Sequence, residues 1–315
     1  MLMKKMLQLP TNRYQKLPAW LMIIIACVMV DVFINVGGTL GYLLLSGPLY
    51  LLKLFIGNGH VNIEPYLDAI EGLHVQLGLF AVIAVVNFAW VKWYEKRPIK
   101  SLGFFRKDRF LEILKGWAVG MLILSISVGV VYLFGGITLN KIDFSMSAIL
   151  YVLSTIPFWF IQGGTEELLT RGWLLPIINK RSNLAIAIAI SGSLFGVLHL
   201  SNDHVTIPSI LCITLSGIFM ALYMIKTDNL WGVAGLHGAW NFAQGNIFGV
   251  AVSGQEAGKS LLHVSGKSGV ANWISGGEFG IEGSFLTCLV LLAGTFILAW
   301  QLKKEKLIFI SKPNK

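Results

Sequence analysis

The sequence predicts an all-α membrane protein, a polytopic bundle of about eight transmembrane helices. Hydrophobic residues make up 55% of the 315 residues, charged residues only 13%, and the mean hydropathy is +0.70. A soluble domain carries about 25% charged residues, so the composition favours a chain that lies mostly in a lipid bilayer. The formal net charge is +9, but the basic residues cluster beside apolar runs. That pattern follows the positive-inside rule and indicates no nucleic-acid partner.

Each predicted helix is an apolar run bounded by charged or turn residues. The first begins near Pro18 and runs to Leu45, with an interfacial tail after Gly47 that reaches Phe55. This run exceeds one span of about 20 residues, so we expect one long or broken helix. Two spans are the alternative, but they would invert the charge pattern downstream. The other seven helices are expected at about 73–94, 110–134, 144–178, 184–201, 207–225, 231–250 and 284–302.

The charge pattern orients these helices. With eight spans, the basic segments and both termini fall on one side, which the positive-inside rule makes cytoplasmic. The loops at 57–72, 135–143 and 251–283 fall on the other side. We therefore expect N-terminal helices and a basic loop in 1–145, a catalytic core in 146–250, and an outer loop, last helix and basic tail in 251–315. Lys- and Arg-flanked spans of this kind suit a bacterial cytoplasmic membrane.

A charged stretch interrupts the fourth predicted helix. Residues 163–172 contain Glu166, Glu167 and Arg171, and apolar residues flank them on both sides. An ionisable group at membrane depth costs about 2.5–3.5 kcal/mol, so three together indicate a structural lock or a functional site. On a helix, Glu167 and Arg171 lie four residues apart and are placed to form an ion pair. Glu166 points about 100° away and is free to face another group.

Two further polar clusters lie inside predicted spans, one at His199 and one at His237 with Asn241. His237 and Asn241 are four residues apart and share a helix face. Glu166 and His199 lie equally far in sequence from the turn at 182–183, which places them at one level in an antiparallel pair. At 1.5 Å per residue, counting from the predicted cytoplasmic turns puts His237 about 10 Å and Glu166 about 20 Å into the membrane from the cytoplasmic side. The clusters therefore meet only if the helix with Glu166 protrudes, tilts or kinks.

These residue types suit hydrolysis. A carboxylate can take a proton from water, and side-chain donors can stabilise an oxyanion. The same set also suits a divalent metal such as zinc, with Glu166, His199 and His237 as the candidate ligands. Asn241 is a poor zinc ligand but a good donor, which favours the metal-free alternative.

Together the three clusters resemble the CPBP family of intramembrane proteases, which includes CAAX proteases and bacteriocin-processing enzymes. The family pattern of EExxxR, FxxxH and HxxxN is present here as Glu166-Glu167-xxx-Arg171, Phe195-xxx-His199 and His237-xxx-Asn241. The resemblance covers about 149–248, with weaker similarity at 101–104 and 276–283.

The resemblance implies an intramembrane endopeptidase that cuts membrane-associated peptides or proteins. It further implies that Glu166 activates water and that His199 positions that water or the base. His237 and Asn241 then stabilise the oxyanion, supported by the pair of Glu167 and Arg171. For a bacterial chain, a peptide pheromone, a leader-bearing bacteriocin or a membrane-protein tail is the expected substrate.

Two other function classes fit the same residues. A non-enzymatic immunity or scaffold protein could keep the fold without turnover. A proton or ion pathway also uses intramembrane Glu and His, although few further polar residues continue a path here.

The remaining histidines are expected to lie outside the site. His60 and His263 fall in polar outer loops, and His74 opens a helix. His204 is close enough to His199 in sequence to be a rival ligand.

Overall fold

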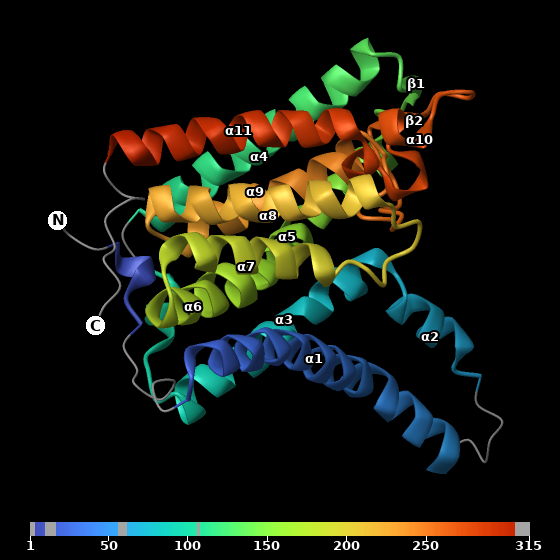
Figure 1. Ribbon diagram of the computed structural model, residues 1–315. Coiled ribbons are helices and arrows are strands. Elements are labelled where there is room, and N and C mark those ends of the chain that lie inside the picture. The colour runs from blue at the N-terminus through green and yellow to red at the C-terminus, as the bar shows by residue number, and fades with distance from the viewer. Residues whose placement is uncertain (1–3, 10–16, 56–61, 106–107, 306–315) are drawn as a thin grey trace.

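The computed structural model describes residues 4–9, 17–55, 62–105 and 108–305, and in these residues it is a helical bundle (Figure 1). Six helices there are long and apolar enough to cross a membrane: α1 (Ala19–Phe55), α3 with its π-helical extension (Leu73–Tyr94), α4 (Arg109–Leu133), a continuous helix over Met146–Arg181, α8 (Ile207–Thr227) and α11 (Phe285–Lys304). The continuous helix consists of α5 (Met146–Glu167), a π-helical segment (Leu168–Leu174) and α6 (Leu175–Arg181). The predicted all-α membrane bundle is confirmed.

The two other predicted spans are shorter helices. α7 (Leu184–Val197) has 14 residues, and α9 (Leu230–Phe242) has 13, followed by a π-helical turn, Ala243–Ile247. At 1.5 Å per residue α7 is about 21 Å long, less than the hydrocarbon core of about 30 Å. The count of eight full spans therefore remains a prediction. Every residue from Gly232 to Asn246 is buried, so α9 lies inside the bundle rather than against lipid.

Glycines allow α9 to pack tightly between α4 and α5. A Cβ atom at Gly163 of α5 would lie 2.7 Å from the backbone nitrogen of Gly238 in α9. On the other side, a Cβ atom at Gly235 of α9 would lie 2.5 Å from the carbonyl oxygen of Ile113 in α4. Small residues at such contacts are how membrane helices bring their backbones together. The closeness of α5 and α9 therefore depends on glycine at these positions.

Two parts of the structure refine the predicted elements. α1 is one continuous helix that contains Pro48, which confirms the single-helix interpretation of the first apolar run. Two segments predicted as outer loops form a small antiparallel sheet, in which β1 (Ile137–Ile142) pairs with β2 (Leu262–Gly266). The remaining short elements are α2 (Glu64–Ile70), α10 (Asn272–Ser275) and the 3-10 turns Lys5–Leu7, Ile99–Leu102, Gly277–Phe279 and Ile281–Gly283.

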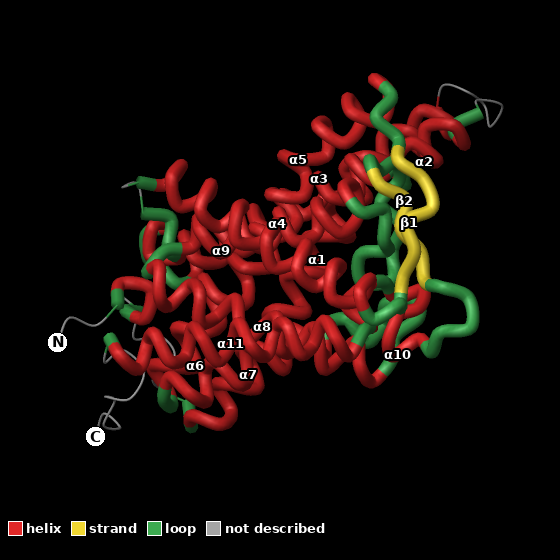
Figure 2. The backbone as a smooth tube through the Cα atoms, turned by 90° about the horizontal axis from the view of Figure 1, so that it is seen from above, coloured by secondary structure: helices red, strands yellow, loops and turns green. Residues whose placement is uncertain are grey.

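The bundle has two distinct ends. At the first, which we name the basic end, Lys4 Nζ donates to the carbonyl of Lys226 (3.2 Å) and Lys180 Nζ to that of Leu9 (3.1 Å). The opposite end, which we name the sheet end, holds β1, β2, α2 and α10 (Figures 1 and 2). The segments predicted to be cytoplasmic thus gather at one end, and the segments predicted to be outer loops gather at the other.

Candidate active site

Four side chains of the predicted site form a connected chain between two helices. Arg171 Nη1 donates to Glu167 Oε1 (2.9 Å), and the same oxygen lies 3.0 Å from His237 Nδ1. The other ring nitrogen, His237 Nε2, lies 3.4 Å from Glu166 Oε2. The side chains of Glu167 and Arg171 are fully buried, whereas that of Glu166 is 17% exposed. Glu167 therefore fixes the ring of His237, and Glu166 remains at the edge of open space.

The helix widens into a π-helical segment (Leu168–Leu174) directly after the two glutamates. Such segments are frequent at functional sites. Within it, Arg171 makes three further contacts: Nη2 donates to the carbonyl of Gly217 in α8 (2.9 Å), Nη1 donates to Thr170 Oγ1 (2.5 Å), and the guanidinium lies over the Phe195 ring at 4.6 Å. Arg171 thus ties α5, α7 and α8 together beneath the glutamates.

The structure also resolves the difference in depth between Glu166 and His237. The helix that carries Glu166 has 36 residues. At 1.5 Å per residue it is about 54 Å long, far longer than the hydrocarbon core. Counting residues from the inner turn therefore does not give the depth of Glu166. The contact of Gly163 with Gly238 sets its level instead, beside His237.

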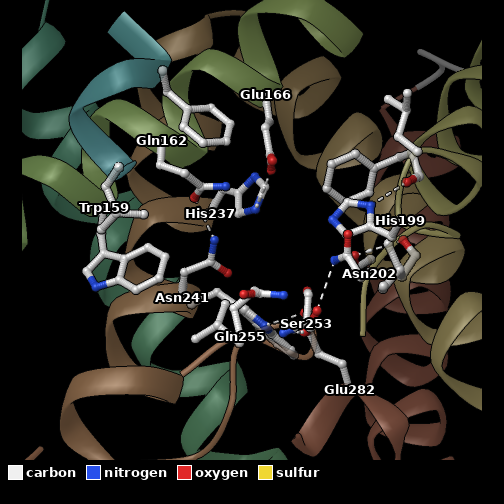
Figure 3. A pocket seen from close by; sticks show the side chains of 18 of the residues that line it. Trp159, Gln162, Glu166, His199, Asn202, His237, Asn241, Ser253, Gln255 and Glu282 are labelled. Atoms are coloured by element: carbon white, nitrogen blue, oxygen red, sulfur yellow. Dashed lines mark hydrogen bonds and ion pairs between the residues drawn. The ribbon is translucent and has the colours of Figure 1, made fainter. Parts of the chain in front are cut away.

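His199 lies opposite this pair, in the turn that follows α7. Its Nδ1 atom donates to the carbonyl of Phe195 (2.7 Å), which leaves Nε2 free to face the cavity. The Phe195 ring contacts both histidines edge to face, with ring centroids 4.8 Å from His199 and 5.6 Å from His237. Figure 3 shows His199 across open space from Glu166 and His237.

A cavity of about 680 Å³ separates the two sides. All four residues predicted to be catalytic line it: Glu166, His199, His237 and Asn241. Further lining comes from α1 and α3 and from the segment 252–256. A cavity of this size holds a short stretch of peptide, since ligand pockets of about 300–1,000 Å³ accommodate drug-sized molecules.

Gln162 also belongs to the site, although it was not predicted from the sequence. Asn241 Nδ2 donates to Gln162 Oε1 (2.8 Å), and both residues line the cavity. Gln162 lies four residues before Glu166, on the same helix face, and this spacing was a usable signal. An amide nitrogen carries two hydrogens, so Asn241 has a second donor for another acceptor after it binds Gln162.

Glu282 was also missed as a site residue, although the segment that contains it showed weak similarity. Its buried carboxylate accepts four hydrogen bonds, from Trp240 Nε1 (3.2 Å), Gln244 Nε2 (3.2 Å), Ser253 N (3.0 Å) and Ser253 Oγ (2.7 Å). The first two donors belong to α9 and its π-helical extension, and Ser253 belongs to the loop at the sheet end. Glu282 therefore joins that loop to α9.

The same loop reaches the turn that carries His199. Asn202 Nδ2 donates to the carbonyl of Ser253 (2.9 Å), and the backbone nitrogen of Asn202 donates to the carbonyl of His199 (3.1 Å). A continuous set of hydrogen bonds thus runs from α9 through Glu282 and Ser253 to the turn that carries His199.

The residues suggested as zinc ligands do not form a metal centre. Among the described residues, no group of three or more His, Cys, Asp or Glu side chains is placed to hold a metal ion. Both nitrogens of His237 face glutamates, and His199 lies across the cavity. The donor set as arranged does not fit zinc, and we derive no step through a metal.

The other described histidines do not line the cavity. His204 Nδ1 pairs with Glu278 Oε2 (2.9 Å) in the exposed loop, and His74 Nε2 lies 2.7 Å from Ser154 Oγ. His263 lies in β2, and His60 is outside the described residues.

Comparison with known proteins gives one match. Residues 146–243 match the family model described as type II CAAX prenyl endopeptidase Rce1-like. No curated protein and no solved structure gives a significant match. The matched residues begin at α5 and include Glu166, His199, His237 and Asn241.

Proposed function

Because residues 146–243 match the family model of Rce1-like type II CAAX prenyl endopeptidases, we propose that this chain hydrolyses peptide bonds in membrane-associated peptides or proteins, with Glu166 as the base that activates water. The observation that carries the proposal is the position of Glu166 on the cavity wall, 3.4 Å from a histidine whose other nitrogen is held by Glu167. The six long apolar helices support an integral membrane protein, and the match over residues 146–243 supports a relation to endopeptidases.

The charges of the buried groups support this assignment. A carboxylate accepts hydrogen bonds, so the contact with Glu167 assigns a proton to His237 Nδ1. Because Nε2 faces the carboxylate of Glu166 at 3.4 Å, we assign it the second proton, which makes His237 a cation between two glutamates. With Arg171, the group then has two negative and two positive charges, and a site of low dielectric constant favours such neutrality.

The reaction follows from these positions. Water bound beside Glu166 loses a proton to the carboxylate as its oxygen attacks the carbonyl carbon of the scissile bond. The oxyanion that forms accepts hydrogen bonds from His237 Nε2 and from the free N–H of Asn241. His199 Nε2 orients the attacking water from the opposite wall. Glu166 then gives its proton to the leaving nitrogen, the C–N bond breaks, and the carboxylate is restored.

The test is cleavage of a quenched fluorescent peptide library by purified protein in detergent. Glu166→Gln should lower kcat by about 10³-fold, since a positioned general base contributes roughly 10²–10⁴-fold. The matched control is Glu64→Gln, the same substitution at an exposed glutamate of α2 that does not line the cavity, and it should cleave normally. A chelator should leave wild-type cleavage unchanged. Normal cleavage by Glu166→Gln would overturn the proposal, and loss of wild-type cleavage with chelator would return Glu166, His199 and His237 to the role of metal ligands.

Two further measurements test the non-enzymatic alternatives. An immunity or scaffold role requires protection of cells by Glu166→Gln equal to that by the wild type, with no cleavage by either. A proton pathway requires a polar route across the bundle, whereas Leu174, Leu175, Ile177 and Ile178 below the site are all 0% exposed and apolar. Proton flux through liposomes that contain the protein measures this directly, and we expect none.

A further inference from the structure

The two ends of the bundle differ in charge. In the described residues, the basic end carries few acids and many bases: Lys4, Lys5, Lys92, Lys96, Arg97, Lys100, Arg109, Lys115, Lys180, Arg181, Lys226, Lys303 and Lys304. The sheet end carries Lys53, Lys141, Lys259 and Lys267 against a larger set of acids: Glu64, Asp68, Glu71, Asp143, Asp203, Glu256, Glu278 and Glu282. Lys- and Arg-rich segments near spans remain in the cytoplasm. The basic end is therefore cytoplasmic, and the sheet end faces outward.

The cavity reaches the surface at the sheet end. Its lining contains five exposed residues: Glu71, Gln76, Ser201, Gln255 and Glu256. They come from the start of α3, from the loop after α7 and from the segment that precedes β2. All three segments lie at the end that holds α2 and the sheet (Figure 1).

The cavity is closed toward the basic end. Leu169 and Thr170 line it, but the next eight residues of the same helix are buried and none of them contributes to the lining. Packing there is tight, because a Cβ atom at Gly172 would lie 2.9 Å from the carbonyl oxygen of Leu102 and 3.4 Å from Leu230 Cδ2. Leu102 and Leu230 are both 0% exposed. Along this helix, the described residues thus leave a peptide no route from the basic end to Glu166.

The short helix α7 contributes to the opening. Its inner end adjoins the basic turn at Lys180 and Arg181, and its length of about 21 Å ends it short of the outer surface of a core of about 30 Å. His199 follows at this outer end. Beyond this end of α7, Ser201 and Asn202 line the cavity.

From these observations we infer that the active site is open to the outer side of the membrane, so that its substrates are peptides presented from outside the cytoplasm: exported peptides or outward-facing segments of membrane-anchored chains. The inference rests on the proposed peptidase function for the nature of the substrate, but the direction of the opening rests on charge, exposure and packing alone.

Cysteine accessibility tests the direction without any need for activity. The three native cysteines, Cys27, Cys212 and Cys288, are first replaced by alanine. In this background, the test variant carries Gln255→Cys at the mouth of the cavity. The matched control carries Lys100→Cys, at an exposed residue of the basic end. Intact bacterial cells are treated with a membrane-impermeant maleimide, and detergent-permeabilised cells give the total reactive thiol for each variant. We expect Gln255→Cys to react in intact cells and Lys100→Cys to react only after permeabilisation. Labelling of Lys100→Cys in intact cells, or its absence at Gln255→Cys, would overturn the inference.

Cleavage then tests the substrate side. The peptide found active in detergent is supplied to spheroplasts, whose outer face is exposed, and to sealed inverted vesicles, whose cytoplasmic face is exposed. We expect at least tenfold faster cleavage by spheroplasts, and equal rates once both are permeabilised. Faster cleavage by intact inverted vesicles would overturn the inference. If no preparation cleaves any peptide, the proposed function fails, and the labelling result still decides the orientation of the cavity.

Discussion

The two walls of the cavity are built in different ways. The α5–α9 wall carries Glu166 and His237 on helices whose backbones touch through glycines, above a buried ion pair. The α7 wall carries His199 on a turn beyond the end of a short helix, and its nearest anchor is a hydrogen bond to Phe195 in the preceding turn. A loop at the sheet end, held by Glu282, connects this turn to α9.

This difference separates two tasks. The α5–α9 wall holds its reactive groups through helix packing, which stays fixed when loops move. The position of the α7 wall instead depends on polar contacts to a loop at the mouth, where a peptide enters. The walls should therefore respond differently to substitution: the first by loss of folding or of all activity, the second by graded loss of rate.

The largest effect is expected from breaking the ion pair under the α5–α9 wall. Arg171→Leu leaves Glu167 as a buried carboxylate without its cation, and removing one partner of a buried pair costs about 3–5 kcal/mol. We expect a clearly lower unfolding midpoint in detergent and no detectable cleavage. Lys115→Leu is the matched control, because Lys115 pairs with Glu112 but its side chain is 55% exposed. Surface pairs contribute only about 0–1 kcal/mol, so an equal loss of stability in the two variants would show that the buried pair has no special role.

Next in size is the effect of separating α5 from α9. Gly163→Ala places a Cβ atom 2.7 Å from the backbone of Gly238, closer than such atoms pack, so the helices must move apart. A misplacement of about 1 Å can cost roughly 10²-fold in rate, and we expect a loss of that order in kcat. The neighbouring variant Gly164→Ala is the control, because its Cβ atom meets Ala234 at an ordinary 3.5 Å. If both variants cleave at the wild-type rate, the glycine contact does not set the geometry of the site.

The sequence predicted the helical bundle and the site residues because apolar runs and i, i+4 polar spacing are local signals. Glu166, His199, His237 and Asn241 were all identified from such patterns, and all of them line one cavity. The pairing of β1 with β2 was missed because it joins segments more than a hundred residues apart. The role of Glu282 was missed for the same reason. The short length of α7 was also missed, because apolar sequence continues past Val197 although the helix ends there.

A smaller effect is expected at Glu282, which connects the two walls through the loop with Ser253. Glu282→Gln replaces an acceptor by an amide in a place where Trp240, Gln244 and Ser253 all donate, so a donor now faces a donor. Glu282 acts as a positioning residue through the turn with His199, and we expect kcat to fall by about tenfold, within the range that small displacements produce.

Hydrogen–deuterium exchange gives this prediction a readout beyond activity. In Glu282→Gln, residues 198–206 should exchange faster, while α9 should keep the protection of the wild type. Glu278→Gln, in the same segment but paired at the surface with exposed His204, is the control for both measurements. Faster exchange in α9 as well would show that Glu282 stabilises the whole core, and that the two walls are not independent.

The smallest effect is expected at His204, which lies only five residues after His199 in the same loop. Its side chain is 51% exposed and pairs with Glu278, so His204→Ala removes a surface contact and should change cleavage by less than about twofold, as surface substitutions change stability by only about 0.5 kcal/mol. His199→Ala should lower kcat by about 10²-fold, because it removes the imidazole that faces Glu166. Equal losses in the two variants would mean that the loop as a whole, rather than the His199 ring, limits the reaction. A large loss at His199 alone would locate the chemistry of the α7 wall in one side chain, with the rest of the loop serving to hold it in place.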